Sequence, residues 1–406
     1  MKYDLLTQIT KQNGYIAKMS RVSAMKNASF VKKGLRRFQD GKIFQVSQIG
    51  EVSLDQLVKR TRDMAGSGVP YAYDLPPARQ EARHFFADCG DPLGEYIKCI
   101  DQLRAKYPKY IFSGKCTRNE FQTSLSSNYG LDLSATGVIY DWMIMYQHME
   151  SGNLSDGYLY GSSIAPQMSE RIQQELEILD SQGKRVSVTQ KRLPVLFCEQ
   201  MTPFKKALRS LMIQNYKSGA SLFADQMGQS IFDSRVTLLD SSVDPENGFV
   251  QFFDGEGVVR HHPDHELVKD GRLVGLMSDL RFAHKYQVPP SGNGRRTFDS
   301  GVGVAENHIC FLGGHQSWRQ VFAEHDEAML IIAAWGGDFN DLGDFSSPVQ
   351  IGYLYKRGVL MGRVNPISIK TSAHKFLGED LIAMTSDRFG VTDESPGVVG
   401  FVDIID

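Results

Sequence analysis

Paired cysteines are missing from this sequence. Its five cysteines include no Cys-x-x-Cys pair, and their number is odd. A disulfide framework or a cysteine-type zinc site is therefore not expected, and a reducing cytosol is the compartment that fits best. The five are Cys89, Cys99, Cys116, Cys198 and Cys310.

Long hydrophobic runs are missing as well. The most apolar stretches, Thr136 to Tyr146 and Met329 to Trp335, are far shorter than the roughly 20 residues that cross a membrane as a helix. The opening residues, Met1 to Asp4, are polar and show no signal-peptide pattern. We therefore expect a soluble, cytoplasmic protein.

A strong charge of one sign is the third feature that the sequence lacks. The formal net charge is -2, too close to zero for the basic surface of a nucleic-acid-binding protein. With 41% apolar and 23% charged residues, the composition is that of an ordinary globular chain. One local basic cluster is expected to be a solvated face, and it consists of Lys32, Lys33, Arg36 and Arg37.

Strand and helix signals follow one another irregularly in the first half of the 406 residues. Residues 15–49 predict a meander of short strands, broken at Lys33-Gly34 and at Asp40-Gly41. A capping box that starts at Ser53 predicts one helix, and Asp91 followed by proline predicts another.

The remainder of the first half adds a strand and a helix. Residues 140–148 alternate as a half-buried strand ending at His148, which we interpret as a core or edge histidine. Residues 168–183 carry an amphipathic helical pattern. A chain of this length favours two domains, so residues 1–183 are predicted to form an N-terminal domain of short strands and helices.

The second half, residues 184–406, is mostly strand-like. After a short strand at residues 193–197, Thr202 to Lys217 is predicted to be one helix with a single apolar face. Many strands with few helices suggest a β-rich domain shaped like a barrel or a sandwich. Without regular βαβ alternation, the fold class of the whole chain is predicted to be α+β.

The stretch from Phe253 to Arg296 carries the polar residues of most chemical interest. Asp270-Gly271 suits a tight hairpin turn, and we therefore expect a β-meander here without a helix. The two ends of the stretch are rich in glycine and charge, a composition that is typical of functional loops.

Three groups of side chains in this stretch are candidates for function. His261, His262 and His265 are capable of binding metal, although Pro263 argues against the helix that would bring them together; a polar loop is the favoured interpretation. The carboxylates of Asp254 and Glu256 share one face of an extended chain and could bind substrate or do acid-base work; a turn, for which Asp-Gly-Glu-Gly is a common sequence, is the favoured alternative.

The third group is an anion-binding loop. Asn293, Arg295 and Arg296 lie among glycines whose backbone donors, with two guanidiniums, suit a peptide carboxylate or a partner surface. A structural role, with the arginines pairing acidic neighbours, is the alternative.

Several motifs of the second half occur in an order that resembles the TldD/PmbA family, whose members have been called modulators of DNA gyrase and are linked to a metallopeptidase. The motifs are Gly228–Ser230 with Val236–Leu238, Phe253–Gly257, Lys269–Gly275, Asp279–Lys285, Ser291–Arg296, Gly336–Asn340 and Gly343–Ser346.

One departure from the family pattern concerns the metal. The family's catalytic subunit looks like a zinc peptidase with His-Glu-x-x-x-His on a helix early in the second domain and a cysteine near the C-terminus. The matching segment here, Thr202 to Lys217, has no His and no Glu, and no cysteine follows Cys310. The resemblance therefore implies a PmbA/TldE-like subunit with no cofactor of its own, and zinc only in a TldD-type partner.

The resemblance also implies a function and partners. This subunit would complete a cleft in which the metal-bearing partner cleaves unfolded or modified peptides. The expected partners are a TldD-like catalytic subunit or a second copy in a homodimer, and a peptide; no membrane or direct nucleic-acid contact is expected. Two alternatives are an independent metal-dependent hydrolase with a relocated site at His261, His262 and His265, and a regulatory binding protein linked to DNA gyrase.

Overall fold

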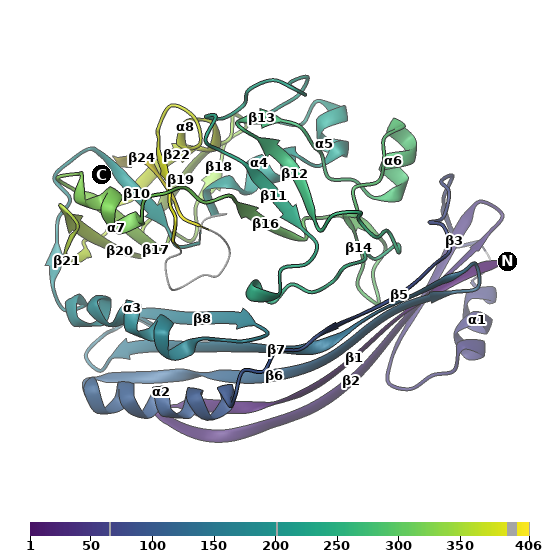
Figure 1. Cartoon of the computed structure of the whole chain (residues 1–406), viewed down its shortest axis with the longest axis horizontal. Coiled ribbons are helices and arrows are strands. Elements are labelled where there is room, and N and C mark those ends of the chain that lie inside the picture. The colour runs from purple at the N-terminus through teal and green to yellow at the C-terminus, as the bar shows by residue number, and fades with distance from the viewer. Residues whose placement is uncertain (65, 200–201, 388–395, 406) are drawn as a thin grey trace.

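The computed structural model describes residues 1–64, 66–199, 202–387 and 396–405. Its many strands and short helices form an α+β fold, as the sequence predicts. Figure 1 shows a long curved sheet from the first half of the chain, with the elements of the second half stacked on one of its faces.

The first sheet is built mainly from long antiparallel strands, with β5 parallel to β7. Among the described residues it has eight strands in the order β4-β3-β2-β1-β6-β7-β5, and β8 pairs with the later part of β7, whereas β5 pairs with its beginning. Its strands are β1 (Lys2–Lys18), β2 (Arg21–Gln39), β3 (Lys42–Ile49), β4 (Val69–Pro70), β5 (Arg79–Phe85), β6 (Tyr110–Ser127), β7 (Leu131–His148) and β8 (Gly157–Ser163).

The predicted break at Lys33-Gly34 is wrong, whereas the turn at Asp40-Gly41 is confirmed. Asp40 and Gly41 have φ angles of 50° and 66°, the left-handed values of a tight hairpin. Gly34 lies within β2, where a Cβ would come 2.1 Å from the carbonyl oxygen of Phe298. Glycine is required there for a close approach between two chain segments, so it does not mark a turn.

The three helices expected in the first half are all present. The capping box at Ser53 begins α1 (Leu54–Arg62), and Asp91 caps α2 (Pro92–Lys106) by accepting from the Gly94 amide. The third helix is α3 (Met168–Ser181). In Figure 1, α1 and α2 cover the outer face of the sheet. α3 packs against α2, where the Ser169 amide donates to Glu95 at 2.8 Å, and it also contacts β21 of the second half.

Residues from 185 onward contribute no strand to the first sheet among the described residues. They form a larger sheet in the order β18-β19-β22-β24-β10-β17-β20-β21-β9, with β23 on β24, a sheet in the order β13-β12-β11-β16, and the pair β14-β15. The domain boundary at residue 183 stays a prediction, because it asserts independent folding.

The strands of the larger sheet are β9 (Arg185–Val186), β10 (Arg192–Phe197), β17 (Ala328–Ala333), β18 (Asp338–Phe339), β19 (Asp344–Pro348), β20 (Ile351–Lys356), β21 (Val359–Val364), β22 (Ser368–Ser372), β23 (Leu381–Met384) and β24 (Val398–Ile405). The smaller sheets contain β11 (Leu238–Ser241), β12 (Asp264–Lys269), β13 (Arg272–Leu273), β14 (Gly294–Arg295), β15 (Gly303–Val304) and β16 (His308–Phe311). The helical turns are η1 (Thr202–Phe204), α4 (Lys205–Ser210), α5 (Ile213–Ser218), η2 (Pro245–Asn247), α6 (Leu280–Tyr286), α7 (Trp318–Ala323) and α8 (Ala373–Phe376). None of the helices in the described ranges is both long and apolar enough to cross a membrane.

The single helix predicted from Thr202 to Lys217 is wrong. The structure divides this segment into η1, α4 and α5, with an extended residue at Met212 (ψ 128°). Met277 causes the break, because its amide donates to Leu211 O and its carbonyl accepts from Ile213 N, both at 2.9 Å. A distant strand-like partner therefore takes the backbone groups that a continuous helix would use.

The helix-free meander predicted for Phe253 to Arg296 is also partly wrong. The hairpin at Asp270-Gly271 joins β12 to β13 as expected. However, α6 follows it, and its N-cap Asp279 accepts a 2.7 Å hydrogen bond from the Phe282 amide. An aspartate N-cap stabilises even a short helix, and this local signal outweighed the strand pattern around it.

Candidate functional site

The segment around Asp254 joins the two halves of the molecule. Phe252 and Phe253 are buried in one apolar cluster with Leu6 and Leu125 of the first sheet. A Cβ on Gly257 would lie 2.6 Å from Leu131 Cδ1, so this glycine allows the segment to lie close against the sheet. The two carboxylates carried by the segment are therefore drawn into the interior.

Asp254 is buried and fully hydrogen-bonded. Its carboxylate accepts from the amides of Glu256, Val258 and Gly294, each at 2.9 Å. Burial nevertheless outweighs these hydrogen bonds and raises the pKa of Asp254 to about 6. This side chain fixes the loop geometry and has little capacity left for a ligand.

Glu256 is the less satisfied member of the pair, and it is only 1% exposed. Its Oε2 accepts a 2.7 Å hydrogen bond from the Leu280 amide, whereas Oε1 lies 3.7 Å from Arg36 Nη1, too far for a hydrogen bond. Burial and the nearby Asp254 raise the pKa of Glu256 to about 8. At neutral pH this carboxyl group is therefore mostly protonated.

Gly294 brings the two carboxyl groups together. A Cβ at this position would lie 2.7 Å from Glu256 Oε2 and 2.9 Å from Asp254 Oδ2. Both side chains thus converge on the backbone of one residue, and only glycine leaves room for them. The predicted pairing of Asp254 and Glu256 on one face of the loop is seen in the structure, but inside the protein and not on an open surface.

An arginine pair surrounds Asp4 next to this site. Asp4 and Arg36 are direct cross-strand neighbours in β1 and β2, 2.6 Å apart, and Arg296 Nη1 lies 2.8 Å from Asp4. Burial alone would raise the pKa of Asp4, but the two guanidiniums hold it below its usual value. Arg36 and Arg37 are both buried, so the interpretation of the basic cluster as a solvated face is wrong for these two residues.

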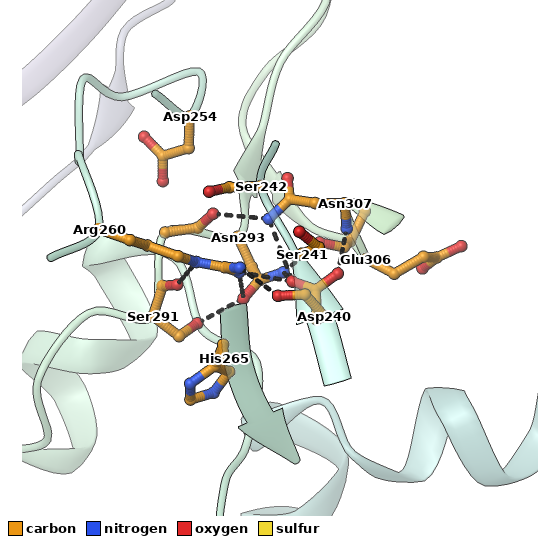
Figure 2. A network of polar contacts seen from close by, with 12 residues as sticks. Asp240, Ser241, Ser242, Asp254, Arg260, His265, Ser291, Asn293, Glu306 and Asn307 are labelled. Atoms are coloured by element: carbon orange, nitrogen blue, oxygen red, sulfur yellow. Dashed lines mark hydrogen bonds and ion pairs between the residues drawn. The ribbon is translucent and has the colours of Figure 1, made fainter. Parts of the chain in front are cut away.

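A second polar network, shown in Figure 2, is centred on Asp240 at the end of β11. Its Oδ2 pairs with Arg260 and accepts from the side-chain amides of Asn293 (2.7 Å) and Asn307 (3.1 Å). Its Oδ1 accepts from the Asn307 backbone amide at 2.6 Å. Ser291 completes the network by donating to Asn293 Oδ1.

The predicted anion-binding loop is not assembled as an open site. Asn293 and Arg296 are 1% and 5% exposed, and their polar groups bond to Asp240 and Asp4 respectively. Arg295 is exposed, and its guanidinium donates to Glu306 O at 3.3 Å. Asn293 and Arg296 therefore have the structural role that was the alternative, in which the loop pairs with acidic neighbours. Because both residues are buried, their donors do not face solvent.

The three candidate histidines lie on the rim of a surface hollow. His261 and His262 are exposed, with their rings edge to face, while His265 Nε2 bonds to Leu276 O at 3.2 Å. Burial and the nearby Arg260 lower the pKa of His265. Within the described part of the chain, no three His, Cys, Asp or Glu side chains are grouped so that they could hold a metal ion.

Three adjoining hollows follow the segment from Glu256 to His262. The first has a volume of about 260 Å³ and is lined by Glu256, and Tyr73 lines both this hollow and the second, of about 350 Å³. Val258 and Val259 line both the second and the third, of about 600 Å³, which reaches His262. Neighbouring hollows share wall residues, and we call the three together the junction groove.

Sequence reasoning missed several residues of this groove. Arg36, Tyr73 and Asp279 line its first hollow with Glu256, although they are far from it or from one another in the sequence. The only local signal was the N-cap position of Asp279. The direct pairing of Asp4 with Arg36 could have been found only from the register of the first hairpin.

The family model for the PmbA/TldA metallopeptidase C-terminal domain matches residues 190–400. This chain therefore belongs to the PmbA/TldD family. The fold is also that of TldE from Thermococcus kodakarensis, with a TM-score of 0.87 at 15% identity over 100% of this chain and 97% of that one. A Thermotoga maritima protein named for modulation of a DNA gyrase gives a TM-score of 0.83 at 16% identity, over 100% and 96%.

Curated relatives match over a shorter region. A protein named metalloprotease from Archaeoglobus fulgidus is 27% identical over 160 residues, which are 39% of this chain and 37% of that protein. A Methanocaldococcus jannaschii protein is 23% identical over 36% of this chain and 35% of its own length. These alignments thus span little more than a third of either relative.

Proposed function

We propose that this chain is the PmbA/TldE-like, non-catalytic subunit of a TldD/PmbA-type metallopeptidase system that cleaves unfolded or modified peptides. A TldD-like partner would supply the zinc and the hydrolytic step, and this chain would supply part of the peptide-binding cleft. A homodimer of this chain is the alternative assembly.

The observation that carries the proposal is the chemistry of residues 202–218. In this family position a zinc peptidase needs imidazole ligands and a general base, but the segment contains no His and no Glu. Its division into α4 and α5 also prevents the one-turn spacing of ligands on a continuous helix. The residues present here do not fit a zinc ion.

The junction groove supports the peptide-binding part of the proposal. Extended peptides bind along grooves that combine apolar walls with a few polar groups. The groove offers Val258, Val259 and Tyr73 as walls and Glu256 as a buried polar group. It runs along the seam between the first sheet and the second half, so a peptide there would touch both.

Metal analysis and a peptidase assay test the proposal directly. The purified chain, dialysed against zinc, is expected to bind less than one equivalent and to leave a pool of unfolded peptides intact. Adding a TldD-type subunit is expected to give a complex and peptide cleavage. A stoichiometric zinc ion retained by the chain alone, or cleavage without the partner, would falsify the subunit proposal.

A triple histidine variant distinguishes the proposed subunit from an independent hydrolase with a relocated metal site. Replacing His261, His262 and His265 with Ala is expected to leave the zinc content of the chain unchanged, because these side chains form no metal-binding group in the described part of the chain. If the chain alone cleaves peptides and the triple variant does not, the protein is a hydrolase in its own right.

A further inference from the structure

The first hollow of the junction groove combines aromatic, apolar and charged walls. Ile43, Met64 and Val69 supply apolar surface, Tyr73 an aromatic ring, and Glu256 and Asp279 carboxyl groups. Its volume of about 260 Å³ is much larger than the roughly 10–15 Å³ that holds one water molecule. A side chain of a bound peptide would have room in it.

Charged side chains of both signs line this hollow. Its wall contains the carboxyl groups of Glu256 and Asp279 and the guanidiniums of Arg36 and Arg281. Arg36 lies 2.6 Å from Asp4 and 3.7 Å from Glu256, and the half-exposed Arg281 lies 3.8 Å from Asp279. Arg36 therefore pairs more closely with Asp4 than with Glu256.

We propose that this hollow binds the positively charged side chain of a peptide substrate, a lysine or an arginine, with Glu256 as its ion-pair partner. The inference rests on the peptide-binding function proposed above. The cation would occupy the space in front of Glu256 Oε1, for which the described residues show Arg36 Nη1 at 3.7 Å as the ion-pair contact. Tyr73 would add a cation-π contact at the wall.

Binding of a cation would displace a proton. A positive charge beside Glu256 favours its ionised form and lowers its pKa from about 8, so the protonated carboxyl group releases its proton near pH 7. Other groups facing Glu256 are Arg36 from β2, Asp254, Asp279, Arg281 and Tyr73. Of these, Asp254, with a pKa of about 6, and Asp279 also have raised pKa values, so loss of the proton release in Glu256→Gln is the observation that assigns it to Glu256.

Two matched peptides test the site on the intact chain. An acetylated, amidated pentapeptide with one arginine among alanines is compared with the same peptide containing citrulline, which has a similar shape but no charge. Calorimetry is expected to show at least about tenfold tighter binding of the arginine peptide, as for a charge-assisted hydrogen bond. Titrations in buffers of different ionisation enthalpy are expected to show proton release for arginine alone.

Each outcome separates the inference from the function on which it rests. Equal affinity of the two peptides, with no proton release, overturns the cation site but leaves peptide binding intact. Binding of neither peptide overturns both. A lysine peptide that behaves like the arginine peptide supports the shared cation chemistry.

The variant Glu256→Gln tests whether Glu256 is the residue that pairs with the bound cation. The variant is expected to lose about tenfold or more of the affinity for the arginine peptide, and all of the proton release, while binding the citrulline peptide as before. Retained citrulline binding also shows that the groove is folded. Glu266→Gln, an exposed position beside Lys269, is the matched control and is expected to behave like the wild type. An undiminished arginine affinity in Glu256→Gln would overturn the assignment.

Discussion

Two buried charge clusters lie close together in this protein and differ in how well they are satisfied. Asp240 is surrounded by donors from Arg260, Asn293 and Asn307, and Figure 2 shows these side chains converging on it. The cluster around Glu256 instead leaves one carboxylate oxygen 3.7 Å from the guanidinium of Arg36 and opens into a hollow. A saturated network holds loops in place, whereas an unsaturated one retains the capacity to bind a ligand.

Breaking the ion pairs of Asp4 is expected to have the largest effect. Removing one partner of a buried pair typically costs about 3–5 kcal/mol, and Asp4→Asn deprives both Arg36 and Arg296 of their partner, so a loss of about 5 kcal/mol is expected. Urea unfolding measures this loss of unfolding free energy. Asp132→Asn, at an exposed position on β7, is the control. A loss below about 1 kcal/mol would mean that water or rearrangement solvates the two arginines.

Asp240→Asn is expected to cost less, about 3 kcal/mol. One guanidinium loses its charge partner, but Arg260 keeps the carbonyl oxygens of Ser291 and Pro263 as acceptors. The same urea measurement applies, with the exposed Asp264→Asn as control. The two variants are compared directly. A larger loss of unfolding free energy in Asp240→Asn than in Asp4→Asn would show that the Asp240 network contributes more to stability than the ion pairs of Asp4.

The replacement Glu256→Gln is expected to change the free energy of unfolding least of the three at low pH. At high pH it is expected to increase this free energy. The folded-state pKa of about 8 exceeds the ordinary value of 4.5, so between these values the folded protein holds a proton that the unfolded chain releases. The free energy of unfolding of the wild type therefore falls as pH rises through this window, by at most about 1.4 kcal/mol per pKa unit. Glutamine cannot ionise.

The measurement for Glu256→Gln is a pair of urea unfolding curves. Near pH 5 the variant is expected to be within about 1 kcal/mol of the wild type, and near pH 8.5 it is expected to be the more stable of the two. The exposed Glu266→Gln should follow the wild type at both pH values. Parallel pH profiles of wild type and Glu256→Gln would contradict a raised pKa for Glu256.

Local signals in the sequence predicted the elements that depend on neighbouring residues alone. The capping box at Ser53, the N-cap at Asp91 and the hairpin at Asp270-Gly271 all have the predicted geometry. The helix from Thr202 failed because Met277, far along the chain, bonds to the backbone at Leu211 and Ile213. Such competition for backbone groups has no local signature.

The sequence by itself determined which chemistry residues 202–217 cannot offer, because the identity of the side chains is sufficient for that conclusion. It also determined the family motifs and the candidate pair Asp254 and Glu256. Only the tertiary structure decided that Arg36 and Arg296 are buried against Asp4, and that Glu256 faces a hollow. The physical reason is that burial and neighbouring charges, brought together from distant segments, set the protonation and availability of a side chain.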